Sequence, residues 1–95
     1  MLKIIVVDDE SIYRKYLINS VEWEKYGFEV CCEAKNGVDA LEKIREYEPD
    51  IGLIDINMPF MNGLELIEKL REESIDMASI LVTGYNEFEY ARKAI

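Results

Sequence analysis

The stretch from Ile51 to Gly63 constrains the fold of this chain more than any other part of the sequence. Apolar or small residues lead directly into Asp55, and a loop-forming segment with Pro59 and Asn62 follows at once. A continuous apolar run is typical of a parallel strand that helices cover on both faces. Asp55 is then expected at the carboxyl end of that strand, where open parallel sheets bind their ligands. A strand-end aspartate that only caps a turn is the alternative at this point.

A second acidic segment follows the apolar residues at the start of the chain. Residues 2–7 are mostly apolar and β-branched, which is typical of a buried central strand, and Asp8 and Asp9 come directly after them. These aspartates could simply cap the next helix, because aspartate is favoured near helix N-termini. If both strands lie in one parallel sheet, however, Asp8 and Asp9 meet Asp55 at the same edge, and a metal site is favoured.

The remaining pattern alternates between strand-like and helix-like segments. Strands are expected at residues 2–7, 28–34, 51–55 and 79–82, and helices are expected to begin at Ser11, Asn36–Gly37, Gly63 and Asn86. The strand at 28–34 has glutamates near its ends, which suits an edge strand. This alternation predicts an α/β fold, a doubly wound parallel sheet with right-handed crossovers.

Each of the first three helices is expected to bury one face against this sheet. Three- and four-residue spacing of apolar residues defines such a face. The predicted inward residues are Tyr13, Tyr16, Leu17, Ser20 and Val21 in the first helix, Val38, Ala40, Leu41 and Ile44 in the second, and Leu64, Ile67 and Leu70 in the third. In the loop after Asp55, the side chains expected to pack inward are those of Met58, Phe60 and Met61.

Composition excludes several classes of function. The chain has 95 residues with a formal net charge of -9, and no basic run, so direct binding to nucleic acid is not expected. It has no histidine, which removes histidine-based triads and metal sites. Its two cysteines, Cys31 and Cys32, are adjacent and are expected to be reduced strand residues in a cytoplasmic protein. The apolar start is too short for a secretion signal or a membrane span.

Three predicted strands deliver polar side chains to one edge of the sheet: Asp8 and Asp9, Asp55, and Thr83. Like charges gathered in one crevice repel, so either the pKa of a carboxyl rises or a cation lies among them, and a hard divalent ion is the simplest answer. Carboxylates, a backbone carbonyl and waters suit Mg²⁺. A carboxylate beside that ion can act as a nucleophile toward phosphorus, and the Thr83 hydroxyl could donate a hydrogen bond to a phosphoryl oxygen.

Together these motifs resemble the receiver domain of two-component response regulators. The resemblance covers the whole chain and is carried by four segments: Val7-Asp8-Asp9-Glu10, Asn36-Gly37 with Ala40-Leu41, Pro49-Asp50 through Asp55, Met58-Pro59, Met61 and Gly63, and Leu81-Val82-Thr83-Gly84. It implies a flavodoxin-like three-layer sandwich with strand order 2-1-3-4 before a fifth strand.

The resemblance also implies roles for individual residues. Asp55 is similar to the phosphoacceptor, Asp8 and Asp9 to the Mg²⁺-binding pair, Asn57 to the donor of a backbone carbonyl to the metal, and Thr83 to the switch hydroxyl. The implied partner is a sensor histidine kinase. The segment from Gly84 to Ala91 looks like the subgroup with an AraC-type helix-turn-helix output domain, which would bind DNA in the full-length protein. Such a domain is no enzyme beyond its own phosphorylation and dephosphorylation.

The sequence departs from the family pattern at its C-terminal end. Family members continue into a fifth strand ending in Lys-Pro and a fifth helix, so residues 1–95 are expected to be an incomplete receiver domain. Without a fifth strand, residues 80–82 would form an open apolar edge, and such an edge pairs readily with another chain. The chain as given is therefore expected to dimerise or to swap elements.

Two other classes of function are open. A haloacid-dehalogenase-like phosphohydrolase also uses a strand-end aspartate with Mg²⁺, but it requires a second aspartate two residues later, where this chain has Asn57. A receiver-like module that no longer accepts phosphate would signal only through protein contacts. Loss of one of the acidic residues or of Thr83 would indicate such a module, and all are present. A nucleotide-binding site is not expected, because no glycine-rich phosphate loop is found.

Overall fold

A computed structural model of the chain describes residues 1–82. The elements in chain order are β1 (Leu2–Val7), α1 (Ser11–Ser20), a 3₁₀ turn η1 (Trp23–Tyr26), β2 (Phe28–Ala34), α2 (Gly37–Tyr47), β3 (Ile51–Asp55), α3 (Gly63–Glu72) and β4 (Ala78–Val82). The predicted helix from Asn86 and the switch residue Thr83 lie outside the described residues.

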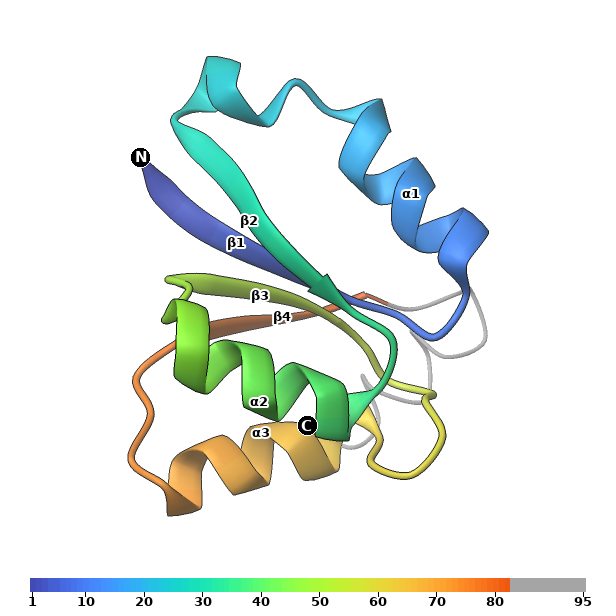
Figure 1. Cartoon of the computed structure of the whole chain (residues 1–95), viewed down its shortest axis with the longest axis vertical. Coiled ribbons are helices and arrows are strands. Elements are labelled where there is room, and N and C mark those ends of the chain that lie inside the picture. The colour runs from blue at the N-terminus through green and yellow to red at the C-terminus, as the bar shows by residue number, and fades with distance from the viewer. Residues whose placement is uncertain (83–95) are drawn as a thin grey trace.

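The described strands form one parallel sheet in the order β2-β1-β3-β4. The predicted doubly wound α/β fold and strand order are therefore confirmed. β1 and β3 are the central strands, and their side chains are largely buried because helices cover both faces of the sheet. In Figure 1, α1 lies on one side of the sheet, while α2 and α3 lie together on the other.

Both α2 and α3 begin with side-chain caps. Asn36 accepts a hydrogen bond from the backbone N–H of Asp39 at 2.8 Å. Asn62 and Glu65 form a reciprocal capping box at the start of α3. These caps satisfy backbone donors that the first turn of a helix leaves without intrahelical partners, and they fix where each helix begins beside the end of a strand.

The predicted helix faces need correction. Tyr13, Tyr16 and Val21 are exposed, and α1 contacts the sheet through the half-buried Leu17 and Ile18. Val38 in α2 is exposed, although its predicted neighbours Ala40, Leu41 and Ile44 are buried. Leu64 in α3 is exposed, and Leu66 is buried in its place. Leu64 is exposed because the buried face of α3 consists of Gly63, Leu66 and Leu70, which are three and four residues apart.

The two outer strands are less buried than the central pair. β2 is an edge strand, as predicted, and is half-buried over most of its length. β4 begins at Ala78 and is not the buried strand that its apolar residues predicted, because Ile80 is exposed and no other β4 side chain is fully buried. The prediction that the chain associates through an open β4 edge stays a prediction.

Candidate functional site

The end of β1 places two carboxylates in different surroundings. The side chain of Asp8 is only 3% exposed, whereas that of Asp9 is exposed. The backbone N–H of Asp8 donates to the carbonyl of Ala34 at 3.0 Å, so β2 holds Asp8 in place. Its Oδ1 accepts the backbone N–H of Glu10 at 2.9 Å. Asp8 is therefore fixed by two strands before any ligand arrives.

Asp55 ends β3, in register with Val82 at the end of β4. Its side chain is half-buried, and the backbone N–H of Asn57 approaches its Oδ1 at 3.4 Å. The following loop turns back tightly, because the N–H of Gly63 donates to the carbonyl of Ile56 at 2.9 Å. A Cβ at Gly63 would lie 2.6 Å from the carbonyl oxygen of Asp55, so only glycine permits this close approach.

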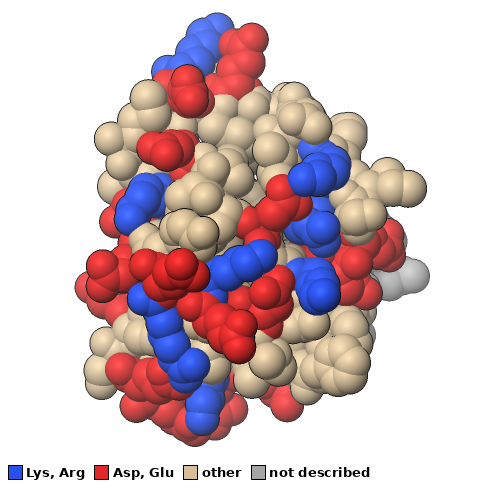
Figure 2. Space-filling model, viewed as in Figure 1, with Lys and Arg blue, Asp and Glu red and all other residues tan. Residues whose placement is uncertain are grey.

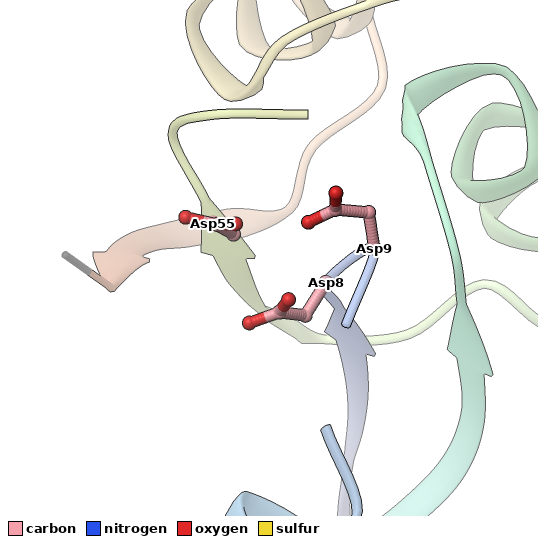
Figure 3. A group of neighbouring side chains, drawn as sticks. All are labelled: Asp8, Asp9 and Asp55. Atoms are coloured by element: carbon pink, nitrogen blue, oxygen red, sulfur yellow. The ribbon is translucent and has the colours of Figure 1, made fainter. Parts of the chain in front are cut away.

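These two strand ends bring three carboxylates together. Asp8, Asp9 and Asp55 each offer an oxygen atom, and these atoms all lie within 4.8 Å of one another. Figure 3 shows the three side chains around a common space beyond the ends of β1 and β3. The predicted meeting of the strand-end aspartates is confirmed by this geometry.

The electrostatics of Asp8 favour a cation in this space. Burial raises the pKa of Asp8, the hydrogen bond from Glu10 opposes that rise, and the nearby charges of Asp9 and Glu10 add to it. A buried carboxylate with like charges beside it costs free energy unless a positive charge compensates. A hard divalent ion with oxygen ligands meets that requirement, so the residues present fit Mg²⁺.

The other predicted site residues are less closely defined. Asn57 follows in the loop after β3 with an exposed side chain, and its predicted role as the donor of a backbone carbonyl to the metal stays a prediction. Thr83 lies outside the described residues, so its predicted role as the switch hydroxyl stays a prediction.

Arg14 in α1 is a residue near the site that the sequence analysis missed. Its Nη1 donates to the carbonyl oxygen of Asp8 at 2.7 Å, and its Nε pairs with Glu33 Oε1 at 2.6 Å. Lys15 Nζ pairs with the other Glu33 oxygen at 2.6 Å. Burial raises the pKa of Glu33, but the hydrogen bonds from Lys15 and Arg14 outweigh that effect and hold it below its usual range. Arg14 thus joins α1 to the ends of both β1 and β2.

The loop between β3 and α3 departs from expectation at Phe60. Met58 is buried and Met61 is half-buried, as predicted, but the Phe60 side chain is 87% exposed. Phe60 also has a φ of 69°, in the left-handed region that non-glycine residues rarely adopt. Met61 packs closely on the start of α2, where a Cβ at Gly37 would lie 2.5 Å from the Met61 carbonyl oxygen. This packing of Met61 fixes the conformation of the loop, in which the Phe60 side chain points to solvent.

A comparison with protein-family models now decides the family. Residues 4–95 match the model described as the response regulator receiver domain. The chain belongs to this family. Phosphorylation and Mg²⁺ binding are general properties of such receiver domains. The match gives no support to a haloacid-dehalogenase-like phosphohydrolase.

Individual relatives agree with the assignment to receiver domains. The chain is 41% identical over 95 residues to an uncharacterized transcriptional regulatory protein, YesN, from Bacillus subtilis, covering 100% of this chain and 26% of that protein. The chain spans between 26% and 37% of the length of the curated relatives that it matches.

Two solved structures share the fold of this receiver domain. One is the REC domain of AraT, a response regulator from Geobacillus stearothermophilus, with a TM-score of 0.87 and 38% identity, covering 98% of this chain and 72% of that one. The other is a two component transcriptional regulator AraC from Clostridium phytofermentans, with a TM-score of 0.85 and 33% identity, covering 100% of this chain and 74% of that one. The predicted resemblance to receivers of the AraC-type group is thereby confirmed.

The surface of the receiver domain agrees with its acidic composition. On the face in view in Figure 2, basic side chains are interspersed among acidic ones and form no continuous patch. In the part of the chain that the structure describes, no helix is both long enough and apolar enough to cross a bilayer.

Proposed function

We propose that this receiver domain accepts a phosphoryl group on Asp55, with Mg²⁺ held by Asp8, Asp9, Asp55 and the backbone carbonyl of Asn57. The observation that carries the proposal is the cluster of three carboxylates within 4.8 Å at the ends of β1 and β3. Of the three, Asp55 comes from the strand opposite the Asp8-Asp9 pair. It is half-buried, so it is held in place and can still be reached from solvent.

The residues of the cluster have different tasks in this proposal. Asp8 is buried and held by backbone hydrogen bonds, which suits a metal ligand better than a nucleophile that must approach a substrate. An Asp55 oxygen attacks phosphorus, and the bond between phosphorus and its donor, a kinase histidine or a small acyl phosphate, breaks. Mg²⁺, when bound, neutralises charge on the phosphoryl oxygens. Hydrolysis of the resulting acyl phosphate returns the domain to its starting state.

Intact-mass measurement after incubation with acetyl phosphate and Mg²⁺ tests this assignment. A receiver that includes the fifth strand found in family members is expected to gain one phosphoryl group, and Asp55→Asn in that receiver is expected to gain none. Asp76→Asn is the matched control, because Asp76 is an exposed aspartate between α3 and β4, far along the chain from the cluster, and should leave labelling unchanged. Labelling that persists in Asp55→Asn rules out Asp55 as the acceptor. If that receiver remains unlabelled without any substitution, the receiver-like module that signals only by protein contacts is favoured.

We further propose that the donor is a sensor histidine kinase and that phosphorylation controls a DNA-binding output domain in the longer protein. Relatives described as transcriptional regulators support this, as does the likeness to receivers of AraC-type regulators. Thr83 is proposed as the hydroxyl that follows the phosphoryl group and shifts the population of states. Beryllium trifluoride can stand in for the phosphoryl group in the full-length regulator. If amide spectra around Thr83 do not change when it binds, the proposed coupling fails.

A further inference from the structure

The two cysteines of β2 lie at an irregularity in the sheet. Ile4 of β1 pairs with Val30, but the next residue, Ile5, pairs with Cys32, so Cys31 has no partner in the register. This β-bulge is of a kind that is rare between parallel strands. Successive side chains in a regular strand point to opposite faces, yet here the two Sγ atoms are 3.5 Å apart. The bulge therefore converts adjacent strand residues into a pair of neighbouring thiols.

The distance between the sulfurs limits what they can hold. An atom bonded to both at about 2.3 Å, the usual length of a zinc–sulfur bond, would have a sulfur–atom–sulfur angle of about 100°. That angle suits a pyramidal or tetrahedral centre. A linear two-coordinate centre would need the sulfurs about 4.6 Å apart at the same bond length. The thiols of Cys31 and Cys32 thus favour a bent, bidentate contact.

The surroundings of the thiols exclude a structural zinc site. Within residues 1–82, the only group of three or more histidine, cysteine or carboxylate ligands is Asp8, Asp9 and Asp55, so no third ligand of these kinds joins the two thiols. Structural zinc sites use four. Lys43 of α2 and Lys3 of β1 place positive charge near Cys32. A better ligand than a divalent cation is a neutral compound whose central atom needs only two thiols, because its remaining bond is already filled by its own substituent.

We propose that Cys31 and Cys32 form a dithiol site for monosubstituted trivalent arsenicals. Such a compound, R–As(OH)₂, carries one carbon substituent and needs two thiols. Two arsenic–sulfur bonds form, two arsenic–oxygen bonds break, and each thiol proton leaves with a hydroxide as water. Arsenic stays trivalent and both sulfurs keep their oxidation state, so the step needs no oxidant. The site is distinct from the carboxylate cluster and is independent of phosphoryl transfer.

The environment of Cys31 and Cys32 favours reagents that bind both sulfurs over reagents that alkylate a single thiolate. Burial, together with the contact with Cys31, raises the pKa of the Cys32 thiol to about 12. A thiol that stays protonated at neutral pH is a poor nucleophile toward reagents that need a thiolate. Reagents that engage both sulfurs at once gain from the proximity of the second thiol.

Binding of phenylarsine oxide to the full chain tests the proposal. Native mass spectrometry is expected to show one phenylarsenic group per wild-type chain, which excess 2-mercaptoethanol leaves in place and 1,2-ethanedithiol removes. Cys31→Ser and Cys32→Ser are expected to lose the adduct under the same 2-mercaptoethanol challenge. Each keeps one thiol, so either variant alone decides the point if the other does not fold. Retention of the adduct by a single-serine variant, or absence of an adduct on the wild type, overturns the proposal.

A second measurement tests whether the folded bulge binds phenylarsine oxide more tightly than two adjacent cysteines do in the unfolded chain. A ligand that binds only the folded state raises the free energy of unfolding by RT ln(1 + [L]/Kd). Phenylarsine oxide at a tenfold excess is therefore expected to raise the urea midpoint of the wild type and to leave both serine variants unchanged. A midpoint that stays constant or falls in the wild type would show that the unfolded chain binds equally well or better, and would overturn the role of the bulge.

Discussion

The two faces of the sheet differ in how they are covered. Toward α2 and α3, ten side chains form a buried cluster that includes Ile5, Ile54 and Leu66. Toward α1, the corresponding buried cluster has three members, Ile4, Val6 and Leu53, and all of them belong to strands. α1 itself contributes no fully buried residue. Among the described residues, the α2 and α3 face therefore supplies most of the apolar burial.

α1 is joined to the sheet mainly through polar contacts and partly buried side chains. Arg14 bonds to the carbonyl of Asp8 and pairs with Glu33, and Trp23 Nε1 donates to the carbonyl of Ile18 at 3.1 Å. Because Arg14 holds the backbone of a site residue, movement of α1 would reach the carboxylate cluster directly. One face of the sheet therefore supplies most of the apolar burial, and the other connects α1 to the backbone of a site residue.

The largest expected difference between the faces comes from truncating leucines. Leu66→Ala removes a side chain that is 0% exposed, and it is expected to lower the free energy of unfolding by about 3 kcal/mol. Leu17→Ala on α1 is expected to cost about 1 kcal/mol, because its side chain is only half-buried. Urea titration measures both. Equal losses would contradict the unequal division of burial, and Leu64→Ala on the exposed side of α3 is the control.

A smaller effect is expected from the polar link of α1. Arg14→Met is expected to cost about 1.5 kcal/mol, because it leaves the Asp8 carbonyl oxygen and Glu33 Oε1 without their charged donor. Lys15→Met should cost less than about 1 kcal/mol, because its ion pair with Glu33 is more exposed. A double-mutant cycle with Glu33→Gln isolates the pair energy. A coupling near zero for Arg14 would show that its ion pair with Glu33 does not hold α1 on the sheet.

As pH falls, the contributions of Glu33 and Asp8 to the free energy of unfolding are expected to change in opposite directions. Ion pairing lowers the pKa of Glu33, so its stabilisation is present above its unfolded pKa and is lost as pH falls through the folded pKa. Burial raises the pKa of Asp8, so its charged form destabilises the metal-free fold at neutral pH, and protonation removes that cost as pH falls through its raised pKa. At neutral pH without Mg²⁺, Asp8→Asn should raise the urea midpoint and Glu33→Gln should lower it.

Repeating these titrations at lower pH tests the assignment, because protonation should shrink the effect of each substitution, for Asp8 with its raised pKa at a higher pH than for Glu33 with its lowered pKa. Added Mg²⁺ at neutral pH should stabilise the wild type more than Asp8→Asn. Substitution effects that do not change with pH would show that packing, rather than charge, explains them.

The smallest expected effect concerns the loop at Phe60. Phe60→Asn is expected to raise the free energy of unfolding by about 0.5 kcal/mol, because asparagine tolerates the left-handed conformation better and little packing is lost. Phe60→Leu is the control, since it keeps an apolar side chain that does not tolerate this conformation. A similar gain in both variants would point to loss of the exposed ring rather than to the backbone.

The strands and the carboxylate cluster could be predicted because they depend on short apolar runs and on topology alone. Once the strands are parallel and β1 lies beside β3, Asp8 and Asp55 must end at the same edge. The family motifs predicted the same arrangement. Helix faces were harder to predict: in α1, the aromatic residues Tyr13 and Tyr16 fit a helical spacing as well as Leu17 does, yet they are exposed.

Three features could not be seen in the sequence because they depend on long-range geometry. The bulge at Cys31 follows from the register between β1 and β2, which the strand pattern does not specify. The outward turn of Phe60 follows from packing of Met61 against the start of α2. Arg14 reaches Glu33, which lies 19 residues away in the chain. Each required knowing which segments meet in space.

The most direct test of the central claim is to locate the phosphoryl group without any substitution. Borohydride reduces an aspartyl phosphate to homoserine, so peptide mass spectrometry of the reduced, acetyl phosphate-treated chain identifies the modified residue. Homoserine is expected at position 55 alone, and only when Mg²⁺ was present during labelling. Homoserine at position 8 or 9, or labelling at position 55 that is independent of Mg²⁺, would contradict the division of roles among the three carboxylates.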